Sequence, residues 1–507
     1  MKKYLKNSLG RILVILFAAT VELFVLLSVF NWFTDKAAWI LLILTVTSVV
    51  ITLGIIKNSR HLSYDVMWIV MILLFPIPGT ILYLFLGADL IMSKTFAKVY
   101  TETQNAFQYY PRDNGVLEEM KEKYPEHKGQ FEYISSNVGF SFYKNRDFRY
   151  YSLGEYGFPE MLKELRKAKR FIFLEYFIID NGHMWNEIVK ILEEKVKEGV
   201  DVRVMYDDLG SFFLLPLSYS KTLEDRGIKC MPFNKINPLL NIIINHRDHR
   251  KIMVIDGKVA FSGGINLADE YINLTHPYGK WKDNVIMVKG EAVWSYTAMF
   301  LTHWNALRPS DENFYDFKVK TSSRKHDGYI APYGETPLDK EMSSQNIYLN
   351  IINQAKDYCY IFTPYLIIDT EMVNALILCA KRGVDVVLVT PGIPDKKIVF
   401  EITRSFYHQL IEGGVRVVEY TPGFVHAKVF VADDMIATVG TINLDYRSLY
   451  LHFENGTYLY DSKVIEEIRD DLLDSIAEGH EVTYEESRRH FLYEFLLSVL
   501  RLFAPLM

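Results

Sequence analysis

Two stretches of the chain place a histidine, a lysine and an aspartate at the same spacing. One is NHRDHRKIMVIDGKVAFSGGIN from Asn245, and the other is VHAKVFVADDMIATVGTIN from Val425. Each contains His-x-Lys, four further residues and Asp, followed by a glycine-containing turn that ends in Asn. Side chains two residues apart share one face of a strand, so each histidine is expected to point the same way as its lysine. Lysine is almost never fully buried unless paired, so this pattern favours chemistry over packing.

Two histidines with two lysines suit the cleavage and re-formation of a phosphodiester. Lys251 and Lys428 can neutralise the non-bridging oxygens, whose negative charge repels nucleophiles. One imidazole of the pair His249 and His426 can attack phosphorus. The other can protonate the departing oxygen and then deprotonate the incoming hydroxyl. An ordinary histidine pKa of about 6.5 suits both tasks at neutral pH.

Further polar residues recur in both motifs. The amides of Asn266 and Asn443, at the ends of the turns, can donate hydrogen bonds to the same phosphate oxygens. Asp256 and Asp433 are expected to orient or pair with nearby groups rather than react, because the nucleophilic role is already filled.

Two carboxylates lie downstream of the motifs, Asp283 in WKDN and Glu454 in LHFENG. Either can accept a hydrogen bond from an imidazole Nδ1–H and so fix its tautomer, or can be an ordinary solvated carboxylate. Four other histidines are not accompanied by a lysine and an aspartate at the motif spacing and are interpreted as structural or surface groups: His246, His276, His303 and His408.

The sequence gives no sign of a metal or a cofactor. Its His, Asp and Glu residues lack EF-hand and HExxH spacing, and no glycine-rich phosphate loop lies between a strand and a helix. We therefore expect neither. Cys230, Cys359 and Cys379 are irregularly spaced and are expected to be buried, reduced thiols.

The elements that carry the motifs also occur twice. KRFIFLEYFIID and YCYIFTPYLIID are apolar runs typical of strands buried on both faces, and a helical stretch follows each. Next come KEGVDVRVMYDD and KRGVDVVLVTPG, in which glycine ends a helix and a new strand begins. The order predicts an α/β protein of two similar lobes, 94–310 and 346–484, joined by a polar linker at 311–345. A pseudo-twofold arrangement would bring both motifs to one active site.

The two ends of the chain are apolar. Within 1–93, apolar runs at about 12–33, 37–56 and 66–87 predict two or three transmembrane segments, of which 37–56 has the clearest signal. Pro76 and Pro78 leave open whether the third run spans or forms a re-entrant hairpin. Residues 485–507 form an amphipathic helix that lies either on a membrane or on the protein core.

Bulk composition excludes one class of partner. The 507 residues carry a net charge of −6, with acidic and basic residues intermixed, so no basic surface for nucleic acid is expected. Half of the residues are hydrophobic, and this excess is concentrated at the two ends.

At HRKIMVID and HAKVFVAD the sequence closely resembles the phospholipase D superfamily. Stretches such as FPIPGTILYLFLG, FSGGINLADEY and GTINLDYRSLYLHFENG extend the resemblance to its bacterial cardiolipin synthases over nearly the whole chain. The resemblance implies that two phosphatidylglycerols give cardiolipin and glycerol through a phosphohistidine. It implies His249 as nucleophile, His426 as general acid and base, and a multi-pass protein of the cell membrane with its lobes on the cytoplasmic side.

Other enzymes of the superfamily would use the same residues, whereas an inactive scaffold would use none of them. A hydrolytic phospholipase D, or transfer to another lipid acceptor, differs only in what accepts the phosphatidyl group. A nuclease of the superfamily would not need the apolar first ninety residues, and intact motifs in both lobes argue against an inactive membrane scaffold.

Overall fold

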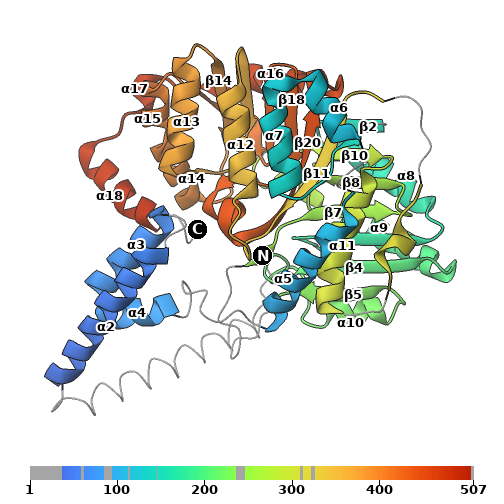
Figure 1. Cartoon of the computed structure of the whole chain (residues 1–507), viewed down its shortest axis with the longest axis horizontal. Helices are drawn as coiled ribbons and strands as arrows, with labels where there is room; N and C mark the ends of the chain where they lie inside the picture. The colour runs from blue at the N-terminus through green and yellow to red at the C-terminus, as the bar shows by residue number, and fades with distance from the viewer. Residues whose placement is uncertain are drawn as a thin grey trace.

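The computed structural model shows two α/β lobes packed against each other (Figure 1). It describes residues 37–58, 62–84, 94–111, 115–145, 147–235, 246–308, 312–320 and 326–503. The apolar run predicted at 12–33 lies outside these ranges. Each lobe has its own sheet, which confirms the predicted α/β class.

The first lobe contains a seven-stranded sheet whose central strands are fully buried, as their apolar sequences predict. Its last three strands are parallel to one another, and the others alternate in direction. The strand order is β2 (Asp147–Tyr151), β10 (Val285–Lys289), β8 (Val259–Gly263), β7 (Lys251–Ile255), β3 (Phe171–Tyr176), β4 (Asp201–Asp207) and β5 (Lys229–Phe233).

The second lobe repeats this order and these directions, which confirms the predicted duplication. Two short strands extend its edges, β1 (Tyr143–Lys144) and β21 (His480–Glu481). The equivalent strands are β11 (Tyr329–Glu335), β20 (His452–Tyr460), β18 (Ile436–Gly440), β17 (Val429–Ala432), β12 (Tyr358–Phe362), β14 (Asp385–Pro391) and β15 (Arg416–Tyr420).

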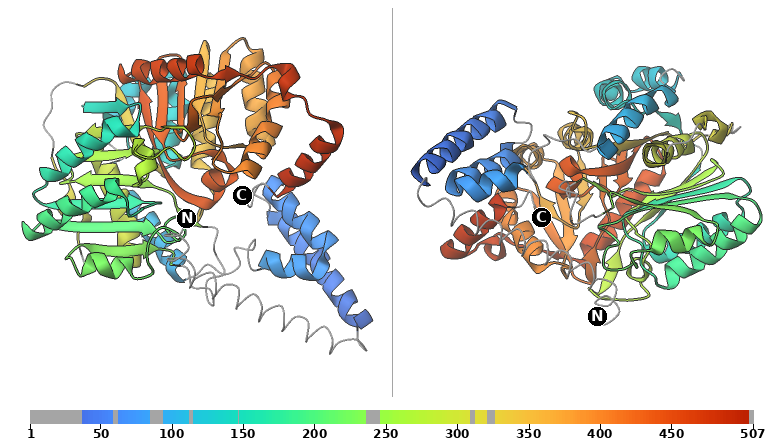
Figure 2. Two further views of the ribbon diagram at one scale, coloured as in Figure 1. Left: turned by 180° about the vertical axis from the view of Figure 1, so that it is seen from behind. Right: turned by 90° about the horizontal axis from the view of Figure 1, so that it is seen from below.

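Helices cover both faces of each sheet (Figure 2). In the first lobe these are α8 (Gly154–Arg166) and α9 (His183–Lys197) on one face and α11 (Val293–Leu307) on the other. In the second lobe they are α12 (Ser343–Gln354) and α13 (Thr370–Lys381), opposed by α16 (Val464–Glu478). Because α11 also contacts β11, it lies at the junction of the lobes. The other helices of the two lobes are α5 (Lys94–Ala106), α6 (Val116–Lys123), α7 (Lys128–Glu132), α10 (Tyr219–Glu224), α14 (Lys397–Ser405), α15 (Tyr407–Glu412) and α17 (Tyr484–Ser487).

Two segments belong to the second lobe although the predicted domain boundaries place them outside it. Residues 116–145 fall within the predicted first lobe, 94–310, yet β1 pairs with β11 and the Gln130 side chain donates to the carbonyl oxygen of Ile347 in the second lobe. Strand β11 itself falls in the predicted linker at 311–345. Its Pro332 is tolerated because β1 pairs only with the first two residues of β11, leaving this proline at an open edge.

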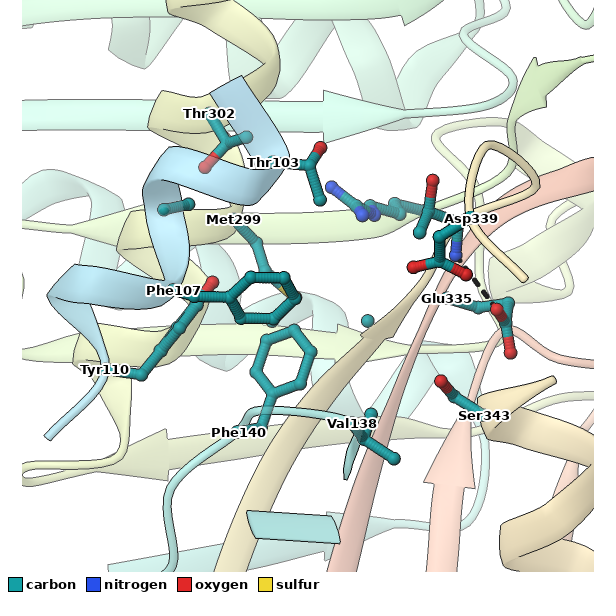
Figure 3. A pocket seen from close by; sticks show the side chains of 14 residues that line it. Thr103, Phe107, Tyr110, Val138, Phe140, Met299, Thr302, Glu335, Asp339 and Ser343 are labelled. Atoms are coloured by element: carbon teal, nitrogen blue, oxygen red, sulfur yellow. Dashed lines mark hydrogen bonds between the residues drawn. The ribbon is translucent and has the colours of Figure 1, made fainter. Parts of the chain in front are cut away.

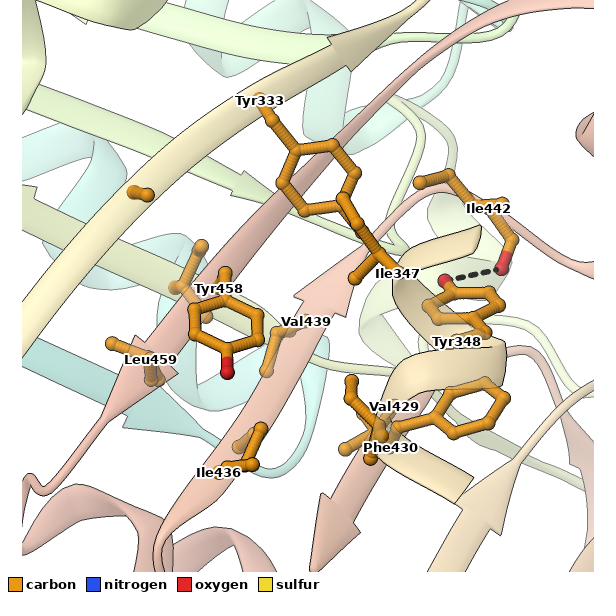
Figure 4. Packing of buried hydrophobic residues seen from close by; sticks show 14 of the residues in the cluster. Tyr333, Ile347, Tyr348, Val429, Phe430, Ile436, Val439, Ile442, Tyr458 and Leu459 are labelled. Carbon is orange, nitrogen blue, oxygen red and sulfur yellow. Dashed lines mark hydrogen bonds between the residues drawn. The ribbon is translucent and has the colours of Figure 1, made fainter. Parts of the chain in front are cut away.

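The core of the second lobe shows how the duplicated strands are held together (Figure 4). Side chains of β11, β17, β18 and β20 pack under α12, where Tyr348 stacks on Phe430 with ring centroids 4.0 Å apart. The Tyr348 hydroxyl donates to the carbonyl oxygen of Ile442, in the turn that ends at Asn443. This packing therefore fixes the turn that follows the second motif.

At the N-terminal side three helices form a small group of their own, α2 (Ala37–Asn58), α3 (Leu62–Leu74) and α4 (Pro76–Leu82). The apolar run predicted at 66–87 breaks at Phe75, directly before Pro76. Within the described ranges, no helix has both the length and the apolar character needed to cross a membrane. The predicted transmembrane helices are therefore not confirmed.

The predicted C-terminal helix is present as α18 (Phe491–Leu502), which lies next to α3 and α14 (Figure 1). Only Leu497 of this helix is buried. Leu500 and Leu502 are partly buried against the core, whereas Phe491 at 75% and Phe495 at 65% exposure face outward. The C-terminal part of α18 therefore packs on the protein, and its N-terminal part presents an exposed apolar surface.

Candidate active site

Each motif histidine directly follows a very short strand that pairs with a strand of the other lobe. Strand β6 (Arg247–Asp248) runs parallel to the start of β20, and the backbone N–H of His249 donates to the carbonyl oxygen of Phe453 at 2.8 Å. Strand β16 (Gly423–Val425) pairs in the same way with β9 (Lys280–Lys282), and His426 N–H donates to the Lys282 carbonyl oxygen, also at 2.8 Å. The two histidines are thus related by the duplication of the lobes.

This pairing places each imidazole beside a carboxylate of the opposite lobe. Nδ1 of His249 lies 2.9 Å from both carboxylate oxygens of Glu454, and Nδ1 of His426 lies 2.6 Å from Oδ2 of Asp283. Both carboxylates are fully buried. Because a carboxylate accepts the Nδ1 proton, Nε2 of each ring is left to react.

The two lysines are also buried in the same place. Lys251 Nζ donates to the carbonyl oxygen of His249 at 2.7 Å, and Lys428 makes the equivalent bond to His426. Burial lowers the pKa of Lys251 to about 7 and that of Lys428 to about 8, although Glu454 and Asp283 oppose both shifts. The ammonium groups are therefore poorly solvated in the free protein, and an anion between them would stabilise their charge.

Aromatic rings keep both imidazoles in an apolar environment. Phe177 lies 4.8 Å from the His249 ring, and Tyr271 lies 5.3 Å from the His426 ring. Burial, and then the charge of Lys251, lowers the pKa of His249 well below its usual range. Burial also lowers the pKa of His426 to about 4, with Lys428 adding to the shift and Asp283 opposing it.

The motif aspartates do not join the imidazoles. The carboxylate of Asp256 accepts the backbone N–H groups of residues 169–171 at 2.7–3.1 Å, where β3 begins. Asp433 accepts those of residues 356–358 at 2.8–2.9 Å, where β12 begins. Each aspartate follows its histidine by seven residues, which span roughly 23 Å when extended, so both lie at the far end of β7 or β17 from the histidines. They hold strand ends, and the orienting role expected of them stays a prediction.

The two asparagines at the turn ends are bound to other protein groups. Asn266 accepts the backbone N–H of Ile178 at 3.0 Å and donates to the Tyr271 hydroxyl at 2.7 Å. Asn443 donates to Asp445 at 2.9 Å. Each amide nitrogen carries two hydrogens, so one N–H of each remains for a phosphate oxygen, and the predicted role stays a prediction.

Several residues of the site were missed by sequence reasoning. The Thr441 hydroxyl donates to Glu454, whereas the equivalent position in the first lobe is Gly264, where a Cβ would come within 1.9 Å of Asp283. The His452 ring lies 5.6 Å from that of His249. Aligning the two motifs residue by residue would have revealed the Gly–Thr difference, but not its contacts.

Within the described residues, two buried groups bring three metal-ligating side chains within 4.8 Å of one another. Both already have basic side chains of the chain beside them: Lys251 opposes the charge of Glu454, and the Arg250 guanidinium lies 3.9 Å from Glu175. Internal cations therefore compensate these carboxylates. The two groups are His249 with His452 and Glu454, and Glu175 with Asp248 and His303.

Comparison with known families extends over both lobes. Residues 161–304 and 348–475 match the family described as "Cardiolipin synthase, PLD-like domain". Residues 45–87 match the family described as "Phospholipase_D-nuclease N-terminal".

Individual relatives cover most of the chain. An uncharacterised protein of Streptococcus mutans is 45% identical over 90% of this chain and 99% of its own. A protein of Halalkalibacterium halodurans named cardiolipin synthase is 34% identical over 92% of this chain and 93% of its own. A crystal structure of phosphatidylserine synthase from Haemophilus influenzae covers 73% of this chain and 96% of its own with a TM-score of 0.54. At 14% identity, that last likeness concerns the fold.

Proposed function

The chain belongs to the cardiolipin synthase family with phospholipase D-like domains, and we propose that it transfers a phosphatidyl group between two phosphatidylglycerols. The products are cardiolipin and free glycerol. The observation that carries the proposal is the crossed pairing of His249 with Glu454 and His426 with Asp283, because the reaction needs two imidazoles of fixed tautomer at one phosphorus.

The reaction proceeds in two displacements at the same phosphorus. First, Nε2 of His249 attacks, the bond from phosphorus to the glycerol headgroup oxygen breaks, and Nε2–H of His426 protonates that oxygen. Then Nε2 of His426 removes the proton from a headgroup hydroxyl of a second phosphatidylglycerol, whose oxygen displaces His249. One phosphodiester is exchanged for another, so no nucleotide is consumed.

The surroundings of the two rings support this division of roles. Burial and the main neighbouring charges all lower the pKa of His249, which keeps it neutral and ready to attack. Asp283 alone among the main influences on His426 raises its pKa, by charge and by hydrogen bonding. A bound phosphodiester adds a negative charge that raises the pKa further, so His426 is the better proton carrier.

The lysine pair predicts how activity changes with pH. In the empty site, Lys251 and Lys428 lose their protons as the pH rises through their pKa values of about 7 and 8. kcat/KM reports the free enzyme, so we expect it to fall more than about tenfold between about pH 7 and 9. The bound phosphate raises both pKa values, so kcat should stay constant to a higher pH.

The pH dependence of kcat/KM and of kcat would be measured with phosphatidylglycerol in detergent micelles. Lys428→Arg is the informative variant, because a guanidinium keeps its charge throughout this range and should make the fall in kcat/KM less steep. A kcat/KM profile that stays flat to pH 9 would contradict the assignment of the lysines as the titrating phosphate ligands.

Product analysis tests the function itself. The purified full-length chain would be incubated with phosphatidylglycerol vesicles, with a chelator and without nucleotide. We expect equal amounts of cardiolipin and glycerol. Phosphatidic acid in place of cardiolipin would identify a hydrolytic phospholipase D. If glycerol is released only after another lipid is added, and no cardiolipin forms, that lipid would be identified as the acceptor.

The exposed apolar surface of α18 supports the proposal that this helix contacts the membrane. Phe491, Leu492 and Phe495 are all more than half exposed, whereas Arg501 is tied to the carbonyl and hydroxyl of Ser405 in the second lobe. Such a helix, fixed on one side and apolar on the other, lies in the headgroup layer of a membrane. This is one part of the proposed location at the cell membrane, with the lobes on the cytoplasmic side.

A tryptophan at position 495 would report this contact. Brominated phosphatidylglycerol in vesicles should quench the added fluorescence of Phe495→Trp. The matched variant Leu378→Trp, at a position 55% exposed on α13, should gain fluorescence that is not quenched. Equal quenching at both positions, or none at 495, would rule out α18 as the membrane contact.

A further inference from the structure

A buried group of four ionisable side chains lies directly behind His249. It comprises Glu175 of β3, Asp248 of β6, His303 of α11, and Arg250, which follows His249 in the chain. Nδ1 of His303 lies 2.9 Å from Oε1 of Glu175 and 3.7 Å from Oδ2 of Asp248. All four residues are at most 4% exposed. Three separate elements therefore converge on one cluster.

The cluster is connected to His249 on both sides. Asp248 precedes His249, and its carboxylate accepts the backbone N–H of Arg250 at 3.3 Å. The Arg250 side chain donates through Nε to the carbonyl oxygen of Glu454 at 3.2 Å. Glu454 is the residue whose carboxylate holds the His249 ring. A shift of the cluster would therefore move both the imidazole and its acceptor.

Aromatic rings and a small cavity surround the cluster. Phe233 stacks on the His303 ring at 5.4 Å, and Phe453 meets the ring edge-on at 4.7 Å. Beyond Arg250 is a cavity of about 30 Å³, whose walls include Phe140 and Met299 (Figure 3). That volume suits about one water molecule and excludes a lipid headgroup. The cluster is thus not a substrate site.

Charge balance explains why these residue types occur together. Two buried carboxylates are tolerated only if cations compensate them. The guanidinium of Arg250, 3.9 Å from Glu175, compensates one. Burial raises the pKa of Glu175 to about 7, Asp248 adds to the shift, and the hydrogen bond with His303 opposes it, so Glu175 retains a proton more readily than an ordinary carboxylate.

The second motif lacks this arrangement. Val425 and Ala427 occupy the positions on either side of His426 that Asp248 and Arg250 occupy beside His249. Both are buried and apolar. The duplication is therefore broken at the residues that flank the two imidazoles. A structural requirement of the fold alone would apply equally to both lobes, so the difference indicates a task specific to His249.

We propose that Glu175, Asp248, Arg250 and His303 form a charge-compensated positioning cluster that aims His249 at phosphorus. Glu175 and His303 are positioning residues, since they touch neither substrate nor reacting atoms. The inference rests on the proposed phosphohistidine mechanism. It requires that the cluster act on formation of the covalent intermediate and have little effect on its transfer to the acceptor, in which His426 removes the proton.

The test measures the two half-reactions separately in the full-length chain. Rapid-quench experiments with phosphatidylglycerol in micelles follow the burst of glycerol and the decay of the trapped phosphoenzyme. We expect His303→Leu to slow the burst about 10–100-fold, with KM and the decay rate changed less than about twofold. His303→Asn, which keeps an amide donor near the Nδ1 position, should recover most of the burst rate. Glu175→Gln provides a second variant should His303→Leu fail to fold.

The control is Thr302→Val on the same helix, whose hydroxyl donates only to the Ala298 carbonyl one turn earlier. It should leave both half-reactions within about twofold of the parent. Equal slowing of burst and decay by His303→Leu, an equal loss in Thr302→Val, or one bound metal ion per chain would each overturn the proposal. If the parent enzyme formed no phosphoenzyme at all, the proposed function would have failed first.

Discussion

Replacing His249 with alanine is expected to abolish the covalent intermediate and to lower turnover about 10⁴–10⁶-fold, the range seen when a catalytic nucleophile is removed. The backbone N–H of residue 249 still donates to Phe453 in the variant, so β6 and β20 should remain paired. The loss would therefore come from chemistry. Mass spectrometry of acid-sensitive phosphopeptides and product analysis would measure both effects, with thermal unfolding as a check on the fold.

His426→Ala separates the two roles when the leaving group is varied. In a phosphatidyl ester of p-nitrophenol, the leaving group p-nitrophenolate departs without needing a proton. This variant should therefore still release one equivalent of it and accumulate an adduct on His249. The adduct should persist because no base remains to activate the acceptor hydroxyl. His249→Ala should give no burst with the same substrate. An adduct found on His426 in the parent enzyme would reverse the assignment.

The duplicated motifs and the strands that carry them could be predicted because their signals are local. Continuous apolar runs such as FIFLEY predict strands buried on both faces, and the Gly-Val-Asp-Val starts recur in both halves, so two similar α/β lobes could be expected. Asp256 could be given an orienting role on the same grounds. The residues alone predict Glu454 and Asp283 as candidate acceptors, and only the family resemblance implies that an acidic group of one lobe supports the histidine of the other.

The remaining features depend on contacts that no local pattern encodes. The crossed pairs require β6 and β16, strands of two and three residues that are too short to show a periodicity. His303 was interpreted as structural or surface because its partners, Glu175 and Asp248, are 128 and 55 residues away in the chain. Strand β11 lies in a polar, turn-rich stretch, which predicts a linker. In each case tertiary pairing outweighed the local signal.

Asp283→Asn is expected to lower kcat about 10²–10⁴-fold, because an amide can donate as well as accept and no longer fixes the Nδ1–H tautomer of His426. It also removes the charge that opposes the low pKa of His426. The side chain keeps its size, which matters beside Gly264, where there is no room for more atoms. The p-nitrophenyl ester should restore the first displacement in this variant but not the second.

Glu454→Gln should have a smaller effect, about tenfold, for a reason visible in the same site. Burial raises the pKa of Glu454 well above its usual range, while Lys251 and the donating hydroxyl of Thr441 oppose this shift. His249 attacks as a neutral imidazole, so its Nδ1–H needs an acceptor more than it needs a negative charge. An amide of the same length still offers an acceptor oxygen, whereas His426, which must carry a proton, depends on a charged partner. Measuring the steady-state kcat of Asp283→Asn and Glu454→Gln in parallel tests whether the first variant loses more activity. Equal losses would mean that the two carboxylates serve their histidines alike, and the assignment of His426 as the proton carrier would have to rest on the trapping experiment alone.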